Sequence, residues 1–186
     1  MATRSSPTSL FHYSEDPTIE VFHPHVAATQ QVEGAWVWAV DAARADTYWF
    51  PRQCPRGSFW ALDAAAPTAQ AELLLAGARR VHAIEWRWLP AMSSTVLYEY
   101  RFEPTGFRYT TELFGGAGRG FWATAETVRP TSVQPVGDLL QRHRDAGNEL
   151  RLVGDLRAYW NVVIATPGID FSGIRLGNAA GPEMPG

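Results

Sequence analysis

The sequence predicts one α+β domain in which a mainly antiparallel sheet is flanked by helices. The chain has 186 residues, 46% of them apolar, which is enough to fill one compact core and few for two. Most apolar residues recur with the two-residue period of strands, while a few stretches have helical composition. We expect the domain to span residues 10–176, with a frayed segment at 1–9 and a flexible tail at 177–186.

The predicted strands either alternate apolar and polar residues or are continuously apolar. The first begins at Leu10, and the others cover 18–22, 35–40, 58–62, 80–85, 96–102, 107–113, 121–126 and 150–153. Four helices are predicted at 42–48, 69–77, 136–146 and 156–165. Because glycine or proline follows the last turn of most of these helices, their ends are defined by sequence.

Charge and composition restrict the partners. The net charge is −3, all 16 basic residues are arginine, and 19 acidic residues are interspersed among them, which argues against a nucleic-acid partner. Single arginines could still hold the phosphates of a small ligand. A single cysteine excludes an internal disulfide framework, and no segment has the roughly 18 apolar residues of a membrane span. We therefore expect a soluble cytoplasmic protein with no membrane partner.

His12 is the most informative candidate for a binding site. It lies where the strand that begins at Leu10 gives way to the polar turn Ser14–Pro17, so its ring is aimed out of the sheet end with nitrogens available to a ligand. The alternative interpretation is a partly buried histidine bonded to a backbone carbonyl. Further along, Asp41 is a good helix N-cap, and Tyr48 follows it by two turns on the same face. Tyr48 could equally serve to pack the helix onto the sheet.

Two arginines lie on a stiff segment between prolines. Pro51 and Pro55 restrict the backbone, so Arg52 and Arg56 could clamp a pyrophosphate or a carboxylate with little loss of entropy. The rival expectation is that both arginines pair with carboxylates and tie the loop to the neighbouring helix. Cys54 between them is an alternative nucleophile, because adjacent arginines lower a thiol pKa. No pairing with His and Asn or Asp is recognisable around it, however, and a lone cysteine is most often buried and inert.

A metal site was also considered at the histidines after the first strand. His23 and His25 could join His12 and Asp16, because residues two apart on a strand point to one face. The proline between them favours a loop, and no further histidine cluster supplies ligands. We expect no metal site.

The order of a strand with histidine, a second strand and a helix with tyrosine resembles the ADP-ribosyltransferase-like superfamily. His12-Tyr13-Ser14 is similar to its His-x-Thr/Ser motif, and Glu126 in the predicted late strand matches its glutamate. The resemblance implies a split sheet around a nucleotide-sized cleft, with NAD as substrate. It implies His12 on the ribose with Ser14 supporting it, Tyr48 on the nicotinamide, Arg52 or Arg56 on the pyrophosphate, and Glu126 at the reacting carbon.

The chain departs from that pattern at one position. Residue 124 is threonine, so there is no Glu-x-Glu or Gln-x-Glu pair, which argues against modification of protein arginines. The charge balance favours a small-molecule acceptor. Separately, the segments 12–17, 38–41, 51–56 and 174–179 resemble, in this order, a bacterial domain family of unknown function that spans nearly the whole chain.

Three functions therefore stay open at the level of sequence. The leading one is NAD-dependent ADP-ribosyl transfer or NAD hydrolysis. The second is an enzyme that does not use NAD and in which His12 and Asp16 act as acid and base on a small substrate. The third is a non-catalytic module that binds a ligand through some of the eight tryptophans. His82 and His143 show no partner pattern, and no role is assigned to them.

Overall fold

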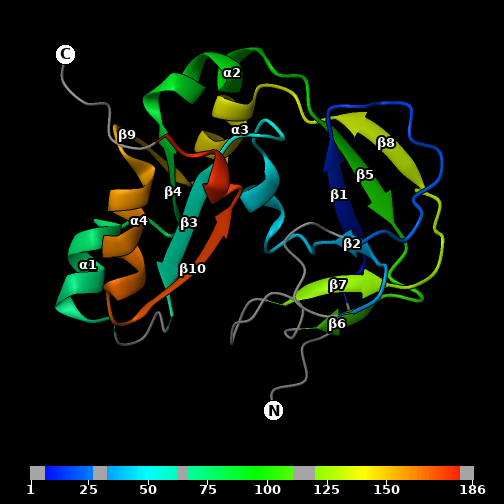
Figure 1. Cartoon of the computed structure of the whole chain (residues 1–186), viewed down its shortest axis with the longest axis horizontal. Helices are drawn as coiled ribbons and strands as arrows, with labels where there is room; N and C mark the ends of the chain where they lie inside the picture. Colours follow the sequence, from blue (N-terminus) through cyan, green and yellow to red (C-terminus); the bar gives the residue numbers. More distant parts are fainter. Residues whose placement is uncertain (1–6, 27–32, 63–66, 111–119, 181–186) are drawn as a thin grey trace. The chain divides into compact units, whose positions relative to one another are not determined.

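The structure, a computed structural model, describes residues 7–26, 33–62, 67–110 and 120–180 (Figure 1). The chain forms two compact units, and each unit is assembled from two stretches of sequence. The first unit comprises residues 1–49 and 96–136, and the second comprises 50–95 and 137–186. The α+β class is confirmed, with antiparallel and mixed sheets. The expectation of one domain over 10–176 stays a prediction.

The first unit consists of two antiparallel three-stranded sheets. One has the order β1-β5-β8, formed by β1 (Leu10–Ser14), β5 (Tyr98–Phe102) and β8 (Ser132–Pro135). The other has the order β2-β7-β6, formed by β2 (Val37–Ala39), β7 (Phe121–Thr124) and β6 (Arg108–Thr110). A short 3-10 helix, η1 (Ala45–Tyr48), follows β2. Leu10, Phe22, Tyr100, Phe102 and Trp122 are among the buried residues of the core of this unit.

The second unit has a four-stranded mixed sheet of order β10-β3-β4-β9, in which β4 and β9 are parallel and the other pairs antiparallel. Its strands are β3 (Arg56–Ala61), β4 (Val81–Glu85), β9 (Glu149–Val153) and β10 (Ile169–Ile174). Its helices are α1 (Ala69–Leu75), η2 (Trp86–Trp88), α2 (Leu89–Ser94), α3 (Leu139–Asp145), α4 (Leu156–Ala165) and η3 (Leu176–Asn178).

Side-chain alternation gives the sheet of the second unit two faces, and the apolar face is the one on which α1 and α4 pack. Phe59 and Val81 point to the face covered by α1 and α4, where they pack with Leu75 and Val163. Ser58, which precedes Phe59 in β3, points to the opposite face of the sheet. The apolar face is tightly packed, since a Cβ at Gly57 would lie 2.5 Å from ring carbons of Trp160.

Several predicted elements differ from the structure. The predicted strand 18–22 is an irregular segment in which Phe22 alone forms a bridge, to Val128. The predicted helix 42–48 is reduced to η1, whose N-cap is Arg44, and the Asp41 carboxylate accepts a bond from the Trp122 indole at 3.2 Å. The described structure also continues beyond residue 176, through η3 to Ala180.

Replacing Gly57 by alanine tests the packing of α4 on the sheet. We expect Gly57→Ala to lower the free energy of unfolding by roughly 1–3 kcal/mol, because the added methyl group forces the Trp160 ring to move. Denaturant titration measures this change. Gly154→Ala is the matched control, since nothing lies within 4 Å of its Cβ position. Equal stability of the two variants would contradict the packing argument.

Candidate functional site

His12 occupies the place where the pairing between β1 and β2 breaks off. Phe11 and Val40 exchange both backbone hydrogen bonds, at 2.8 and 2.9 Å. The Trp38 carbonyl, two residues before Val40, accepts a hydrogen bond from Nδ1 of the His12 ring at 3.0 Å. The imidazole is therefore bonded to the β2 backbone beside the Phe11–Val40 bridge.

This bond fixes the tautomer of His12. A carbonyl oxygen can only accept, so the proton of the neutral ring lies on Nδ1 and Nε2 carries the lone pair. The ring is half-buried, and Phe22 meets it edge to face at 4.9 Å between centroids. The structure thus shows a partly buried histidine bonded to a backbone carbonyl. A ligand on its other nitrogen stays a prediction.

Ser14 and Asp16 form the turn that follows β1. The buried Ser14 hydroxyl accepts from the Asp16 N–H at 3.2 Å, while the Asp16 carboxylate accepts from the hydroxyl and N–H of Thr18 at 2.7 and 2.8 Å. These bonds from Thr18 lower the pKa of Asp16 below its ordinary value. The bonds from Thr18 thus favour the ionised form of the Asp16 carboxylate.

Tyr48 lies on the other side of β1 from His12. Its ring is nearly parallel to that of Tyr13, at 12° and 6.4 Å between centroids, and side chains of Tyr13 and His12 alternate across the strand. The Tyr13 hydroxyl donates to the buried carboxylate of Glu99 at 2.7 Å. The sequence analysis missed Glu99, since only the register of β1 and β5 places it opposite Tyr13.

Glu126 does not lie on a strand. β7 ends at Thr124, and Glu126 is exposed in the bend that follows, with its N–H donating to the Thr124 hydroxyl at 3.2 Å. The strand registers nevertheless place this bend at the end of β2 that lies toward Ser14, beyond the bridge between β1 and β2. Thr124 pairs with Val37, and β1 runs from the Phe11 bridge toward this same end at Ser14.

Arg52, Cys54 and Arg56 belong to the second unit. Arg56 is buried, donates to the Cys54 carbonyl at 3.1 Å and lies 5.2 Å from the Phe50 ring centroid, whereas Arg52 is exposed. His12, Tyr48 and Glu126 belong to the first unit, so the proposed arginine clamp stays a prediction. Cys54 is fully buried, and this burial raises the pKa of its thiol to about 12. The suggestion of a nucleophilic Cys54 is therefore wrong, because desolvation outweighs the charge of Arg56.

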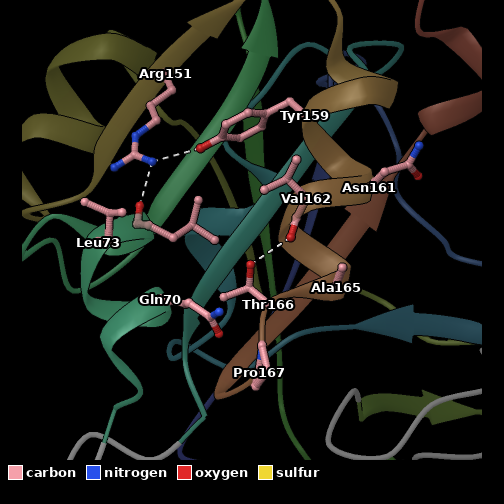
Figure 2. Close-up of a pocket in the computed structure, with 10 residues that line it drawn as sticks. Gln70, Leu73, Arg151, Tyr159, Asn161, Val162, Ala165, Thr166 and Pro167 are labelled. Atoms are coloured by element: carbon pink, nitrogen blue, oxygen red, sulfur yellow. Dashed lines mark hydrogen bonds between the residues drawn. The ribbon is translucent and has the colours of Figure 1, made fainter.

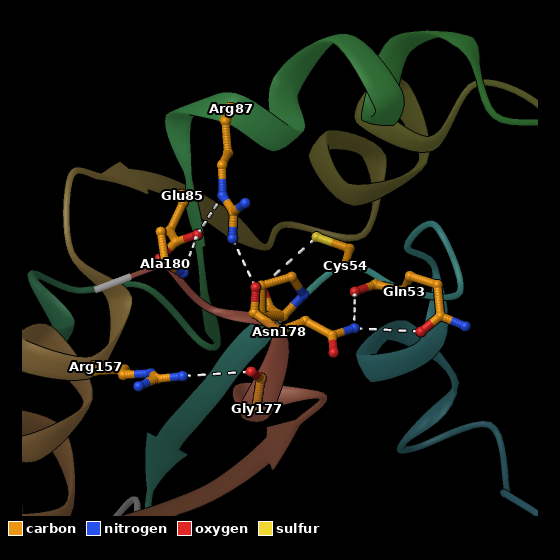
Figure 3. Close-up of polar contacts among 9 residues, drawn as sticks. Gln53, Cys54, Glu85, Arg87, Arg157, Gly177, Asn178 and Ala180 are labelled. Atoms are coloured by element: carbon orange, nitrogen blue, oxygen red, sulfur yellow. Dashed lines mark hydrogen bonds and ion pairs between the residues drawn. The ribbon is translucent and has the colours of Figure 1, made fainter. Parts of the chain in front are cut away.

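The segment around Cys54 is joined to the end of the described chain (Figure 3). The Asn178 side chain donates to the Gln53 carbonyl at 2.8 Å, and Arg87 donates to the Asn178 carbonyl at 2.6 Å. Glu85 accepts from Arg87 at 2.8 Å and from the N–H of Ala180 at 3.2 Å. Two of the motifs that the sequence analysis singled out, at 51–56 and 174–179, thus meet in one polar network.

In the four-stranded sheet of the second unit, the face opposite α1 and α4 contains a serine–histidine pair that the sequence did not reveal. The Ser58 hydroxyl and Nδ1 of His82 are 2.7 Å apart, and the rings of Phe50 and His143 lie 5.4 and 4.7 Å from that of His82. Burial, and next the neighbouring His143, lower the pKa of His82 well below its ordinary value. Ser58 and His82 have no exposed surface, so this pair is part of the core.

A metal site and a surface groove are the two other kinds of site to consider in this fold. Within residues 7–26, 33–62, 67–110 and 120–180, no three His, Cys, Asp or Glu side chains are grouped to hold a metal ion. Nδ1 of His23 lies 3.3 Å from the Thr127 hydroxyl.

A shallow groove of about 830 Å³ lies between α1 and α4 (Figure 2). Leu73 and Val162 line it, and at one end Arg151 donates to the Leu74 carbonyl and the Tyr159 hydroxyl.

Comparison with known proteins assigns the chain to a family without a known activity. The model of a family described as "Family of unknown function (DUF6886)" matches residues 11–179. The chain belongs to this family. No curated protein and no solved structure matches it. None of the helices in the described part of the chain is long and apolar enough to cross a membrane.

The buried His82 predicts a loss of stability in acid. Its folded pKa lies below its ordinary value near 6.5, so below that pH the unfolded chain binds a proton that the folded chain does not. The free energy of unfolding should fall by up to about 1.4 kcal/mol per pH unit between pH 6.5 and 5. Denaturant titrations at several pH values measure it. His82→Gln should show a shallower dependence, and an unchanged slope would contradict the argument.

Cys54 should be unreactive in the folded protein. Because its thiol is buried with a pKa of about 12, almost no thiolate is present at neutral pH. A colorimetric thiol reagent should therefore react slowly with the native protein and at once in denaturant. Stoichiometric labelling of the native protein within seconds would show that the thiol is accessible.

Proposed function

We propose that the first unit binds NAD and transfers its ADP-ribosyl group to a small-molecule acceptor or to water. The observation that carries this proposal is the place of His12, whose ring lies beside the bridge between β1 and β2 and is tied to the Trp38 carbonyl. The resemblance of the His12-Tyr13-Ser14 segment to the first-strand motif of ADP-ribosyltransferases implies a histidine in this role.

The tautomer of His12 suits a ribose. With the proton on Nδ1, the lone pair on Nε2 can accept a hydrogen bond from a ribose hydroxyl. Because Trp38 and Phe22 both contact the ring, its orientation is set before the ligand arrives, which reduces the entropy lost on binding. Ser14 supports this arrangement indirectly, through the turn that its hydroxyl forms with Asp16.

Glu126 is the proposed catalytic carboxylate. When the bond between nicotinamide and the ribose carbon breaks, nicotinamide leaves with the electron pair and positive charge develops on the ribosyl group. A carboxylate near that carbon stabilises the charge, and the acceptor oxygen then bonds to the carbon and releases its proton. Exposure of Glu126 in the bend after β7, at the end of β2 that lies toward Ser14, is compatible with this role.

The resemblance also implies roles for Tyr48 and two arginines. Tyr48 would contact the nicotinamide, although its ring packs on Tyr13 across β1 from His12. Arg52 and Arg56 belong to the second unit, so the proposed site in the first unit is argued without them. The alternative with His12 and Asp16 as acid and base stays open, since an ionised carboxylate is the form that accepts a proton.

Ligand-dependent melting and two variants test this function. NAD or ADP-ribose at about a hundred times its dissociation constant should stabilise the protein by roughly 2.7 kcal/mol. Glu126→Gln should keep the affinity and lose turnover, because a neutral amide cannot stabilise a cation, whereas His12→Ala should weaken binding. Glu103→Gln, another exposed glutamate of the first unit, is the matched control.

Two results would contradict the proposal. A folded protein whose melting temperature does not change at millimolar NAD does not bind it usefully. Nicotinamide release at the parental rate by Glu126→Gln would show that Glu126 has no catalytic role. Binding of NAD with no release of nicotinamide by the parent protein would favour the non-catalytic binding module.

A further inference from the structure

Tyr100 is a fully buried residue of β5 that lies opposite His12 in the strand register. Its hydroxyl donates to the Asp16 carbonyl at 2.5 Å and accepts from the Ile19 N–H at 3.1 Å. A single hydroxyl therefore satisfies two backbone groups of the irregular segment after β1. This pair of bonds fixes the path of that segment where no helix or strand does so.

The same segment carries Phe22 onto the imidazole. The Phe22 ring meets the rings of His12 and Tyr100 edge to face, at 4.9 and 5.1 Å between centroids. Its backbone exchanges two hydrogen bonds with Val128, at 2.8 and 3.0 Å. Residues 16–22 are thus held at one end by the Tyr100 hydroxyl and at the other by Val128, with Phe22 against His12.

We propose that Tyr100 is a positioning residue for His12. Its hydroxyl holds residues 16–22, and through them the Phe22 ring, in the position that keeps the His12 imidazole on the Trp38 carbonyl. Without this support the imidazole gains freedom to rotate, and Nε2 is no longer held in one direction. The expected effect on NAD affinity rests on the proposed function, whereas the expected effect on the orientation of the His12 ring does not.

The test compares two variants that each lose one tyrosine hydroxyl group. Tyr100→Phe removes the bonds to Asp16 and Ile19 and keeps the ring, while Tyr159→Phe removes the bond from Arg151 in the second unit. Nitrogen-15 and carbon-13 NMR of the imidazole of His12 reports the tautomer directly. We expect Tyr100→Phe to shift His12 from the pure Nδ1–H form toward a mixture and Tyr159→Phe to leave it unchanged.

The affinity of each variant for NAD is the second measurement. Tyr100→Phe should raise the dissociation constant of NAD by roughly three- to tenfold, the value of about one hydrogen bond, while the parent value is kept in Tyr159→Phe. If the parent protein does not bind NAD, the proposed function fails and the NMR comparison still decides the positioning role. An unchanged His12 spectrum in Tyr100→Phe, or an equal change in both variants, would overturn the inference.

A second variant covers the case in which Tyr100→Phe does not fold. Phe22→Leu leaves the Tyr100 hydroxyl and its two bonds intact but removes the ring that contacts His12. The inference expects the same shift of the His12 resonances in this variant. Parental resonances in folded Phe22→Leu would overturn it, because the hydroxyl would then have no route to the imidazole.

Discussion

The interaction on which the candidate site depends is the bond between the His12 ring and the Trp38 carbonyl. The backbones of β1 and β2 meet in an isolated bridge between Phe11 and Val40. The His12 ring adds a bond to the Trp38 carbonyl beside this bridge and so ties the two strands together. The same bond orients the imidazole, so one contact serves both the stability of the sheet and the chemistry of the ring.

The second unit uses buried polar groups differently. Ser58 and His82 bond to each other inside the sheet, and His82 is packed against aromatic rings, so the pair stays neutral and closed to solvent. Glu85 in β4, Arg87 in η2 and Asn178 in η3 are joined in one network nearer the surface. A buried hydrogen bond such as that between Ser58 and His82 defines one arrangement of the backbone, because any alternative leaves polar groups unsatisfied.

Periodicity along the sequence predicts elements where local patterns decide the conformation. The helix 156–165 is confirmed at its predicted ends, where Asp155 caps the first turn and Pro167 follows the last. β10 was missed, because Ser172 and Gly173 break its alternation and only pairing with β3 makes it a strand. The partners of His12 and Tyr13 could not be predicted either, since they depend on registers between distant strands.

The order of segments along the chain has a consequence for synthesis. Each unit combines an early and a late stretch of sequence, so neither is complete when its first strand leaves the ribosome. β3 pairs with β10 through Ala61 and Ile169, and β5 pairs with β8 through Tyr98 and Pro135. Such distant pairings carry a large loop-closure cost and slow folding. The nascent chain therefore exposes unpaired strand edges until most of the protein has been made, and truncated products lack the partners that would cover them.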